Sequence, residues 1–303
     1  MALGAYLAGE VAEDYAGGLL DRREALRRLG LLGLTAAGAG ALLAACGGGD
    51  GDGAVTGSGG TTAAPTGDAP GSAAAGLAGG DTVRFAGPAG ELSAAWALPP
   101  RDPVAAVLVI HENRGLTPHF HDLVGRLAGE GYAALCVDLL SAEGGTASMD
   151  DPAAAPAALG AASEERLLGD LGAGIGELQR RAPGVKTGAV GFCFGGAMAW
   201  QLVQSGEPRL SAIAPFYGPA PDPADFSRSR AAVLAVYAGE DDRVNASRPR
   251  ATSALEAAGL THRVRTFDGA QHAFFNDTGP RYHAEAAAEA WRTLLDWFAT
   301  HLT

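Results

Sequence analysis

Basic charge is scarce in this chain. Lys186 is the single lysine among 303 residues, and 34 acidic side chains outnumber 22 basic ones, for a formal net charge of −12. A nucleic-acid-binding surface needs a basic stripe that neutralises phosphates, so this charge balance excludes nucleic acid as a partner. The shares of hydrophobic residues (47%) and charged residues (18%) are typical of a folded globular protein.

Cysteine is also rare, with only Cys46, Cys136 and Cys193 in the chain. No CxxC pair and no zinc-ligand spacing is present, so we predict neither a disulfide framework nor a metal site, and no cofactor. The histidines of the HFH stretch, His119 and His121, are two residues apart and would point to different sides of a helix. Because no third ligand accompanies them, we predict that they lie at the surface or line a pocket.

The segment from Asp21 to Cys46 has the pattern of an export signal. Four arginines come first, residues 29–45 are uncharged and mildly apolar, and small residues follow in LAAC. RREALR resembles the twin-arginine export motif, and LAAC resembles a bacterial lipobox, in which the cysteine (here Cys46) is lipid-modified and becomes the mature N-terminus. We therefore predict that residues 1–46 are an export and lipoprotein signal region with an N-terminal extension.

This prediction places the remainder of the protein in the cell envelope, lipid-anchored on the outer face of the cytoplasmic membrane. Two alternatives stay open at this point. Export could use the general secretory route, and the segment could remain as an uncleaved anchor helix. The apolar run is short for the second alternative, because a spanning helix takes about 20 apolar residues.

Residues 47–80 and 81–303 differ sharply in composition. The first stretch contains Gly, Ala, Ser, Thr, Pro and Asp with almost no large apolar side chain, which predicts a flexible linker. From Asp81 onward, apolar runs such as VAAVLVI and YAALCVDLL alternate with helical patterns. That alternation predicts an α/β domain with a mostly parallel central sheet and helices on both faces. Residues 141–162 are rich in small residues and are expected to form a long loop with a binding role.

Chemistry in such a sheet gathers beyond the carboxyl ends of the strands. Several polar side chains directly follow predicted strands and are therefore candidates for the site: His111, Glu112, Asn113, Cys193, Asp241 and His272.

GFCFGG places Cys193 in the G-x-nucleophile-x-G pattern of a nucleophile elbow, a sharp turn between a strand and a helix. The flanking Gly191 and Gly195 supply the room that such a turn needs. A helix N-terminus at this point would favour the thiolate over the thiol. A buried structural cysteine is the alternative, but a core cysteine does not require glycines two residues away on both sides.

A thiol nucleophile needs a base and a group that orients the base. Asp241 and His272 follow Cys193 in the chain order nucleophile, acid, histidine that is typical of α/β-hydrolases. Glu240 and Asp242 flank Asp241, so spacing alone leaves the choice of the acid open. The backbone N–H groups of Phe194 and of Asn113 are the candidate oxyanion hole.

These residues resemble the dienelactone hydrolase (carboxymethylenebutenolidase) family, the cysteine branch of the α/β-hydrolases. The matching segments cover about residues 81–303: HENRGL with PHFHD, GFCFGG, YAGEDDRV and GAQHAFFNDTGPRYHAEAAAEAW. The resemblance implies the α/β-hydrolase fold, selects Asp241 as the acid, and implies that Glu112 contacts the resting thiol and assists its ionisation.

The resemblance is incomplete at the substrate. The family's type enzyme holds a substrate carboxylate with two arginines, and this chain has Ala142 and Asn276 at those positions. Arg114 or Arg281 could compensate, so we count these two residues and Asn276 as candidate substrate-binding residues.

We therefore expect a hydrolase that cleaves a small carboxylic ester or lactone through a Cys193–His272–Asp241 triad and a thioester acyl-enzyme. The alternative is a non-catalytic exported lipoprotein that keeps the fold and binds a small molecule.

Overall fold

The computed structural model describes residues 3–46 and 80–303. These belong to two compact units, one made of residues 1–7 with 77–303 and the other of residues 8–76. The predicted linker, apart from Gly80, lies outside the described residues. In the part of the chain that is described, no helix combines the length and the apolar character needed to cross a membrane. Export and the lipidation of Cys46 stay predictions.

Three helices precede the linker: α1 (Leu3–Ala16), α2 (Arg22–Leu31) and α3 (Ala36–Cys46). Helix α1 begins in the first unit and continues into the second. Within the second unit, Val11, Leu29 and Leu43 are buried in one apolar cluster. The apolar run 29–45 is therefore divided between α2 and α3 and does not form one helix. In α2, hydrogen bonds from Arg27 and Arg28 lower the pKa of Glu24 to about 2.

The first unit contains an eight-stranded sheet in the order β1-β2-β4-β3-β5-β6-β7-β8. The strands β3 to β8 are parallel, and β2 pairs antiparallel with both β1 and β4. Their bounds are β1 (Asp81–Gly87), β2 (Gly90–Ala97), β3 (Ala105–Ile110), β4 (Tyr132–Val137), β5 (Thr187–Phe192), β6 (Leu210–Phe216), β7 (Ala232–Ala238) and β8 (His262–Phe267). Every residue of β3, β4, β5 and β7 is buried, as expected for strands that helices cover on both faces.

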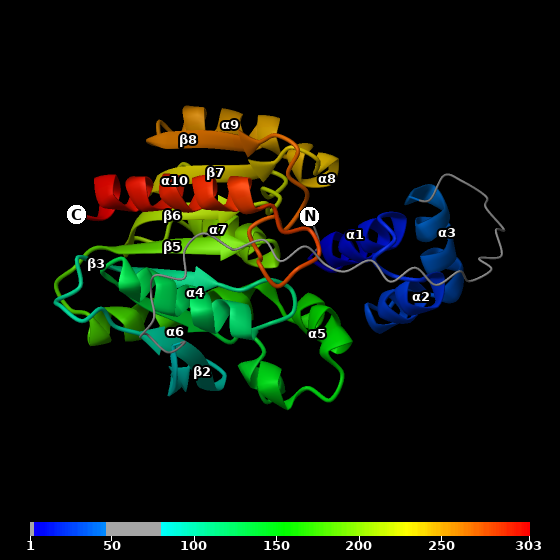
Figure 1. Ribbon diagram of the computed structural model, residues 1–303, viewed down its shortest axis with the longest axis horizontal. Helices are drawn as coiled ribbons and strands as arrows, with labels where there is room; N and C mark the ends of the chain where they lie inside the picture. Colours follow the sequence, from blue (N-terminus) through cyan, green and yellow to red (C-terminus); the bar gives the residue numbers. More distant parts are fainter. Residues whose placement is uncertain (1–2, 47–79) are drawn as a thin grey trace, which may run out of the picture. The chain divides into compact units, whose positions relative to one another are not determined.

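Helices α4 and α10 lie in front of the sheet in Figure 1, and α6 and α7 lie behind it. The helix bounds in this unit are α4 (Pro118–Gly129), α5 (Ala155–Ala161), α6 (Glu164–Arg181), α7 (Phe194–Ser205), α8 (Asp242–Asn245), α9 (Arg248–Ala257) and α10 (Ala284–Leu302). Helix α6 begins where the sequence predicts, because Ser163 Oγ accepts a hydrogen bond from the Arg166 N–H. The predicted sheet with helices on both faces is confirmed.

The segment 141–162 differs from the predicted loop. It contains three 3₁₀ helices, η1 (Ser141–Glu143), η2 (Thr146–Ser148) and η3 (Pro152–Ala154), and then α5. The buried carboxylate of Asp138, just after β4, accepts hydrogen bonds from the backbone N–H groups of Leu140 and Thr146 and from the Thr146 hydroxyl. These bonds order the start of the segment. Short polar side chains that fold the backbone locally leave little trace in hydrophobic periodicity.

Glycines allow α7 to approach the sheet very closely after β5. A Cβ atom on Gly191 would lie 2.0 Å from the carbonyl oxygen of Gly195, and one on Gly195 would lie 2.2 Å from the carbonyl oxygen of Ile110. On Gly196 it would lie 2.3 Å from the carbonyl oxygen of Phe216. Because these neighbours are backbone atoms, they cannot move aside without moving the strands. The glycines of GFCFGG are therefore required by packing.

We predict that Gly191→Ala lowers the free energy of unfolding by at least about 2 kcal/mol, because overpacking against backbone forces the turn to shift. Gly176→Ala on α6 is the matched control, since its new Cβ atom would meet only the end of the Arg209 side chain, at 3.6 Å. This control should be neutral or gain up to about 1 kcal/mol from helix propensity. Urea unfolding measures both variants, and equal stability of the two would contradict the packing argument.

Candidate active site

Cys193 stands at the turn between β5 and α7. Its backbone has φ 55° and ψ −114°, and it is the N-cap residue of α7. Its N–H donates to the Phe216 carbonyl oxygen at 3.1 Å, which ties the turn to the end of β6. The residue is only 3% exposed. The structure thus places the thiol at the carboxyl edge of the sheet, on a strained turn at a helix N-terminus, where negative charge is favoured.

Asp241 and His272 come together although 31 residues separate them in sequence. His272 Nδ1 lies 2.6 Å from Asp241 Oδ2, and both side chains are buried. The other carboxylate oxygen of Asp241 accepts a hydrogen bond from the Val244 N–H at the start of α8. Glu240 and Asp242 are exposed, so the carboxylate that the sequence could not choose by spacing is selected by this contact.

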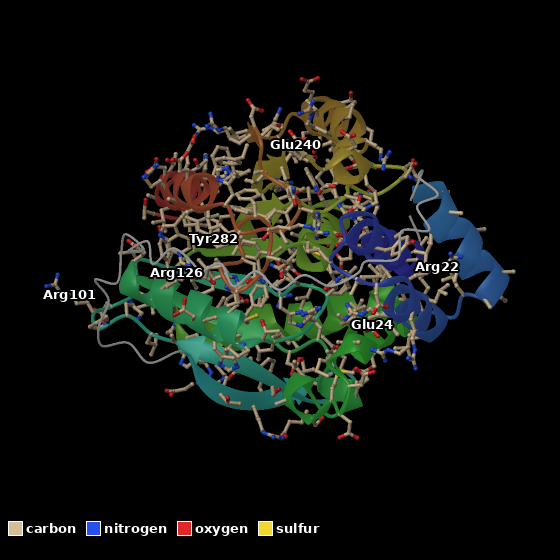
Figure 2. The ribbon with its side chains drawn as sticks, turned by 45° about the vertical axis from the view of Figure 1, so that its right-hand side comes forward. Arg22, Glu24, Arg101, Arg126, Glu240 and Tyr282 are labelled. Atoms are coloured by element: carbon tan, nitrogen blue, oxygen red, sulfur yellow. The ribbon has the colours of Figure 1, made fainter. Side chains whose placement is uncertain are left out.

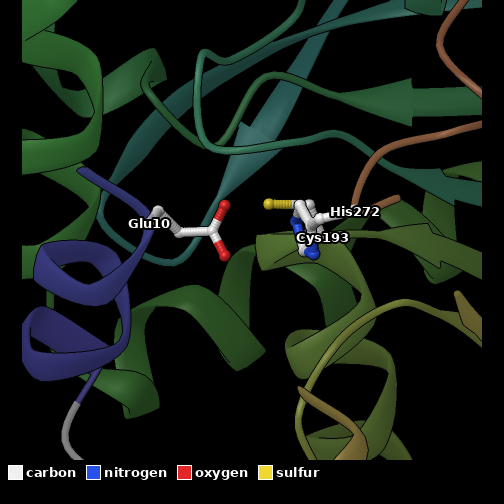
Figure 3. A group of neighbouring side chains, drawn as sticks. All are labelled: Glu10, Cys193 and His272. Carbon is white, nitrogen blue, oxygen red and sulfur yellow. The ribbon is translucent and has the colours of Figure 1, made fainter. Parts of the chain in front are cut away.

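The thiol of Cys193 and the imidazole of His272 lie close together. The sulfur of Cys193 and a ring nitrogen of His272 lie within 4.8 Å of one another (Figure 3). Because Nδ1 is engaged by Asp241, Nε2 is the nitrogen available for proton exchange with the sulfur.

Glu112, which follows β3 by two residues, is held by two side chains from other elements. Tyr217 donates its hydroxyl to one carboxylate oxygen at 3.3 Å, and the Asn276 amide donates to the other at 2.8 Å. Burial raises the pKa of Tyr217 well above its ordinary value, and the charges of Glu112 and Cys193 act in the same direction. The phenol therefore stays protonated and acts as a donor to Glu112.

Sequence analysis missed Tyr217, although it directly follows β6 and the rule of strand carboxyl ends could have found it. It is one of three non-glycine residues with positive φ in the described part of the chain, with Cys193 and Ala273. All three lie in turns around the site, and Ala273 is the neighbour of His272. Such backbone strain persists only where the surrounding packing enforces it.

The candidate oxyanion groups lie on the two segments that the elbow brings together. Phe194 begins α7, so its N–H is among the first of the helix, which have no carbonyl partner within it. Gly195 packs against the backbone at the end of β3, and Asn113 follows that strand by three residues. Both segments therefore border the turn that carries Cys193.

The three predicted substrate-binding residues have different surroundings in the structure. Asn276 hydrogen-bonds Glu112 and accepts from Thr278, so it is part of the network around the carboxylate. Arg114 is exposed, and Arg281 is half-buried in the segment between His272 and α10. Ala142 lies in η1.

Of the two positions predicted for His119, at the surface or lining a pocket, the surface position is wrong. Its side chain is buried on α4, and its Nδ1 lies 2.8 Å from an oxygen of Asp277. His121 is half-buried and contacts the Gly80 carbonyl oxygen. In the described part of the first unit, no three His, Cys, Asp or Glu side chains converge as metal ligands.

His111 has a structural position beside the site. Its Nδ1–H donates to the Glu112 carbonyl oxygen at 2.7 Å, and its Nε2 accepts the Leu139 N–H at 3.0 Å. The ring thus joins the segments that follow β3 and β4. Burial lowers the pKa of His111, against an opposing effect of Asp138. The neutral ring is the form that this pair of hydrogen bonds requires.

The chain is similar in sequence to known proteins. The model of the dienelactone hydrolase family matches residues 92–302. A Saccharolobus solfataricus protein named "Putative carboxymethylenebutenolidase" is 32% identical over 230 residues, which cover 63% of this chain and 88% of that protein. An Escherichia coli K12 protein with the same name is 30% identical over 209 residues, covering 65% and 77%.

Solved structures share the fold. The structure titled "Putative Dienelactone Hydrolase" from Klebsiella pneumoniae superposes with a TM-score of 0.65 at 26% identity, covering 73% of this chain and 99% of that one. A dienelactone hydrolase from Anabaena variabilis gives 0.57 at 19% identity, covering 74% and 98%, which shows a likeness of fold alone.

We predict that His111 makes stability fall as the pH drops below 6.5, its ordinary pKa. Because the pKa of His111 is lower in the folded chain, the unfolded chain binds a proton at this residue at a higher pH than the folded chain does. The stability that His111 contributes at neutral pH is therefore lost as the pH falls. His111→Asn removes the titration. The unfolding free energy of the unmodified protein should therefore fall more steeply than that of the variant, by about 1.4 kcal/mol per pH unit. Parallel curves from urea unfolding at several pH values between 7.5 and 5.5 would show this account to be wrong.

Proposed function

Because the chain belongs to the dienelactone hydrolase family, we propose that it hydrolyses a small carboxylic ester or lactone through a covalent thioester on Cys193. The protein is a carboxylic ester hydrolase by its family and by its relatives. The proposal adds the residues and the intermediate. It rests on one observation above all: a buried Asp241–His272 pair whose imidazole lies within 4.8 Å of an elbow thiol.

The first half of the reaction forms the acyl-enzyme. His272 takes the thiol proton on Nε2. Asp241 holds the ring in the tautomer in which Nε2 carries no proton, and it stabilises the imidazolium that forms. The thiolate attacks the ester carbonyl carbon, and the backbone N–H groups of Phe194 and Asn113 receive the developing oxyanion. Collapse of this intermediate expels the alcohol, which takes the proton from His272.

The second half returns the enzyme to its resting state. His272 is again neutral and removes a proton from water, which attacks the thioester carbonyl. The carboxylic acid leaves, and the thiol is restored. This sequence needs no group other than the side chains and backbone already in place.

Glu112 assists the ionisation of the thiol in this proposal. Its carboxylate is fixed by Tyr217 and Asn276, which leaves it in one orientation beside the site. Burial of Tyr217 and its contact with Glu112 keep the phenol proton in place, so Tyr217 remains a hydrogen-bond donor to the carboxylate.

Substrate recognition differs from that of the family's type enzyme. Asn276 and Ala142 stand where the resemblance would place arginines, and Asn276 is occupied with Glu112. A neutral amide and a methyl group cannot form bidentate contacts with a carboxylate. We therefore propose that the substrate is an ester or lactone without an obligatory carboxylate, with Arg114 or Arg281 as the nearest candidates for polar contacts.

We predict that Cys193→Ala reduces turnover of small esters and lactones by at least about 1,000-fold while near-UV circular dichroism stays unchanged, because the nucleophile alone is lost. Cys136→Ala is the matched control: this thiol is fully buried in β4 and should be dispensable for turnover. Retained activity in Cys193→Ala would rule out the mechanism and would favour a binding protein or a different nucleophile.

A second variant tests the role of the acid. Asp241→Asn keeps the shape of the side chain but stabilises neither the required tautomer nor the imidazolium, so kcat should fall by about 100- to 10,000-fold. Asp242→Asn, at the exposed neighbouring carboxylate, should leave kcat within about twofold. Initial rates with a panel of small esters give both values, and an equal loss in the two variants would remove Asp241 from the mechanism.

A further inference from the structure

An aromatic side chain from the start of the chain lies against the Cys193 sulfur. Tyr6, in the part of α1 that belongs to the first unit, has its hydroxyl oxygen 3.4 Å from Sγ. The Tyr6 side chain is buried, with 2% exposure. The contact joins residues that are 187 positions apart, so it is a product of the fold and not of chain proximity.

Arg243 contacts the face of the same ring. Its guanidinium carbon lies 4.7 Å from the centre of the Tyr6 ring, well within the range of a cation–π interaction. Arg243 follows Asp241 by two residues and sits on the short helix α8 that Asp241 caps. The element that positions the catalytic acid therefore also presents a cation to an aromatic ring in the site.

A cavity continues from Tyr6. It has a volume of about 300 Å³, and its walls include Tyr6, Ala197 and Met198 of α7, and the segment Pro219–Pro221. Ala197 is on the first turn of the helix that Cys193 caps. The cavity has the size of a small-ligand site, and it borders the thiol through Tyr6.

We propose that the position of the Tyr6 ring is a subsite for the aryl group of an aryl ester, and that Tyr6 occupies it as a phenol product would. This assignment rests on the proposed function and names its substrate class. It applies to the chain that keeps residues 1–46, because cleavage of the predicted signal at Cys46 would also remove Tyr6. An oxygen at 3.4 Å from the sulfur is where the leaving oxygen of a bound ester would lie, because its carbonyl carbon must come within about 3–3.5 Å of Sγ for attack. Arg243 holds the ring, and the cavity beside Tyr6 accommodates further substituents.

The bonds that form and break when an aryl ester reacts in this arrangement balance as follows: one S–C bond forms and one C–O bond breaks. The sulfur gives an electron pair to the carbonyl carbon, the S–C bond forms, and the π electrons of the carbonyl move to oxygen. As the carbonyl re-forms, the bond from carbon to the aryl oxygen breaks, and its electron pair leaves with that oxygen. The His272 imidazolium returns the thiol proton to the oxygen, which yields neutral phenol. Water then cleaves the thioester and restores the thiol.

Tyr6 competes with the substrate on this account. An aryl ester enters the subsite only when the Tyr6 ring leaves it, so the apparent affinity is reduced by the fraction of molecules in which the ring is bound. Removing the ring should therefore lower KM for aryl esters and leave the chemistry of the thiol unchanged.

The experiment compares two esters whose leaving groups differ in aromaticity, phenyl acetate and cyclohexyl acetate, on the full chain and its variants. Tyr6→Ala should raise kcat/KM for phenyl acetate by at least about fivefold, mainly through KM. Arg243→Leu should lower kcat/KM for phenyl acetate by about fivefold more than for cyclohexyl acetate, because only the first offers a π face to the cation. Comparing variants by this double ratio cancels the different intrinsic reactivity of the two esters.

Tyr282→Ala and Arg101→Leu are the matched controls. Both side chains are exposed at the surface (Figure 2), and neither should change the double ratio. Inhibition of the unmodified chain is measured as well, so that the proposal can be tested even if a variant fails to fold. Phenol should inhibit hydrolysis of ethyl acetate competitively, and with a lower inhibition constant than cyclohexanol.

The outcomes separate the two proposals. Full activity of Cys193→Ala on both esters overturns the proposed function and the subsite with it. An inactive Cys193→Ala, combined with an unchanged double ratio in Arg243→Leu or with equal inhibition by phenol and cyclohexanol, overturns the aryl subsite alone. No gain in kcat/KM for phenyl acetate in Tyr6→Ala also overturns it.

Discussion

The close approach of α7 to the carboxyl edge of the sheet is the constraint on which the site depends. Gly191, Gly195 and Gly196 let backbone pass against backbone at distances that any Cβ atom would prevent. The turn gives Cys193 a positive φ at the start of α7 and holds its N–H against the end of β6. It thereby places the thiol at the carboxyl edge of the sheet, where the residue is 3% exposed.

The second feature of the site is that its two carboxylates, the buried Asp241 and the half-buried Glu112, both have fixed hydrogen-bond partners. Asp241 is bonded by His272 and by the start of α8, and Glu112 is bonded by Tyr217 and Asn276. Buried carboxylates are costly unless their oxygens are satisfied, so these contacts fix the orientation of both acids. The orientation of Asp241 in turn fixes the imidazole ring of His272, which bonds to it through Nδ1.

The elements that build the triad also shape what enters it. Asp241 caps helix α8 and Arg243 lies within it, so one short helix joins the residue that orients the imidazole to the residue that contacts an aromatic ring. Asn276, where the family resemblance would place an arginine, donates to Glu112 as a neutral amide. A site that offers a cation to a π face, and an amide in place of an arginine, is suited to neutral aromatic esters more than to carboxylates.

The sequence by itself determined the alternating sheet architecture, because continuous apolar runs and amphipathic spacing reflect burial that is local to each element. It also determined the elbow, because Gly191 and Gly195 around Cys193 record a steric requirement within five residues. Tertiary structure alone decided which of three adjacent carboxylates meets His272, that Tyr217 and Asn276 hold Glu112, that His119 is buried, and that Tyr6 reaches the sulfur. These contacts join segments distant in the chain, and no local pattern records the direction in which a side chain points once the strands have assembled.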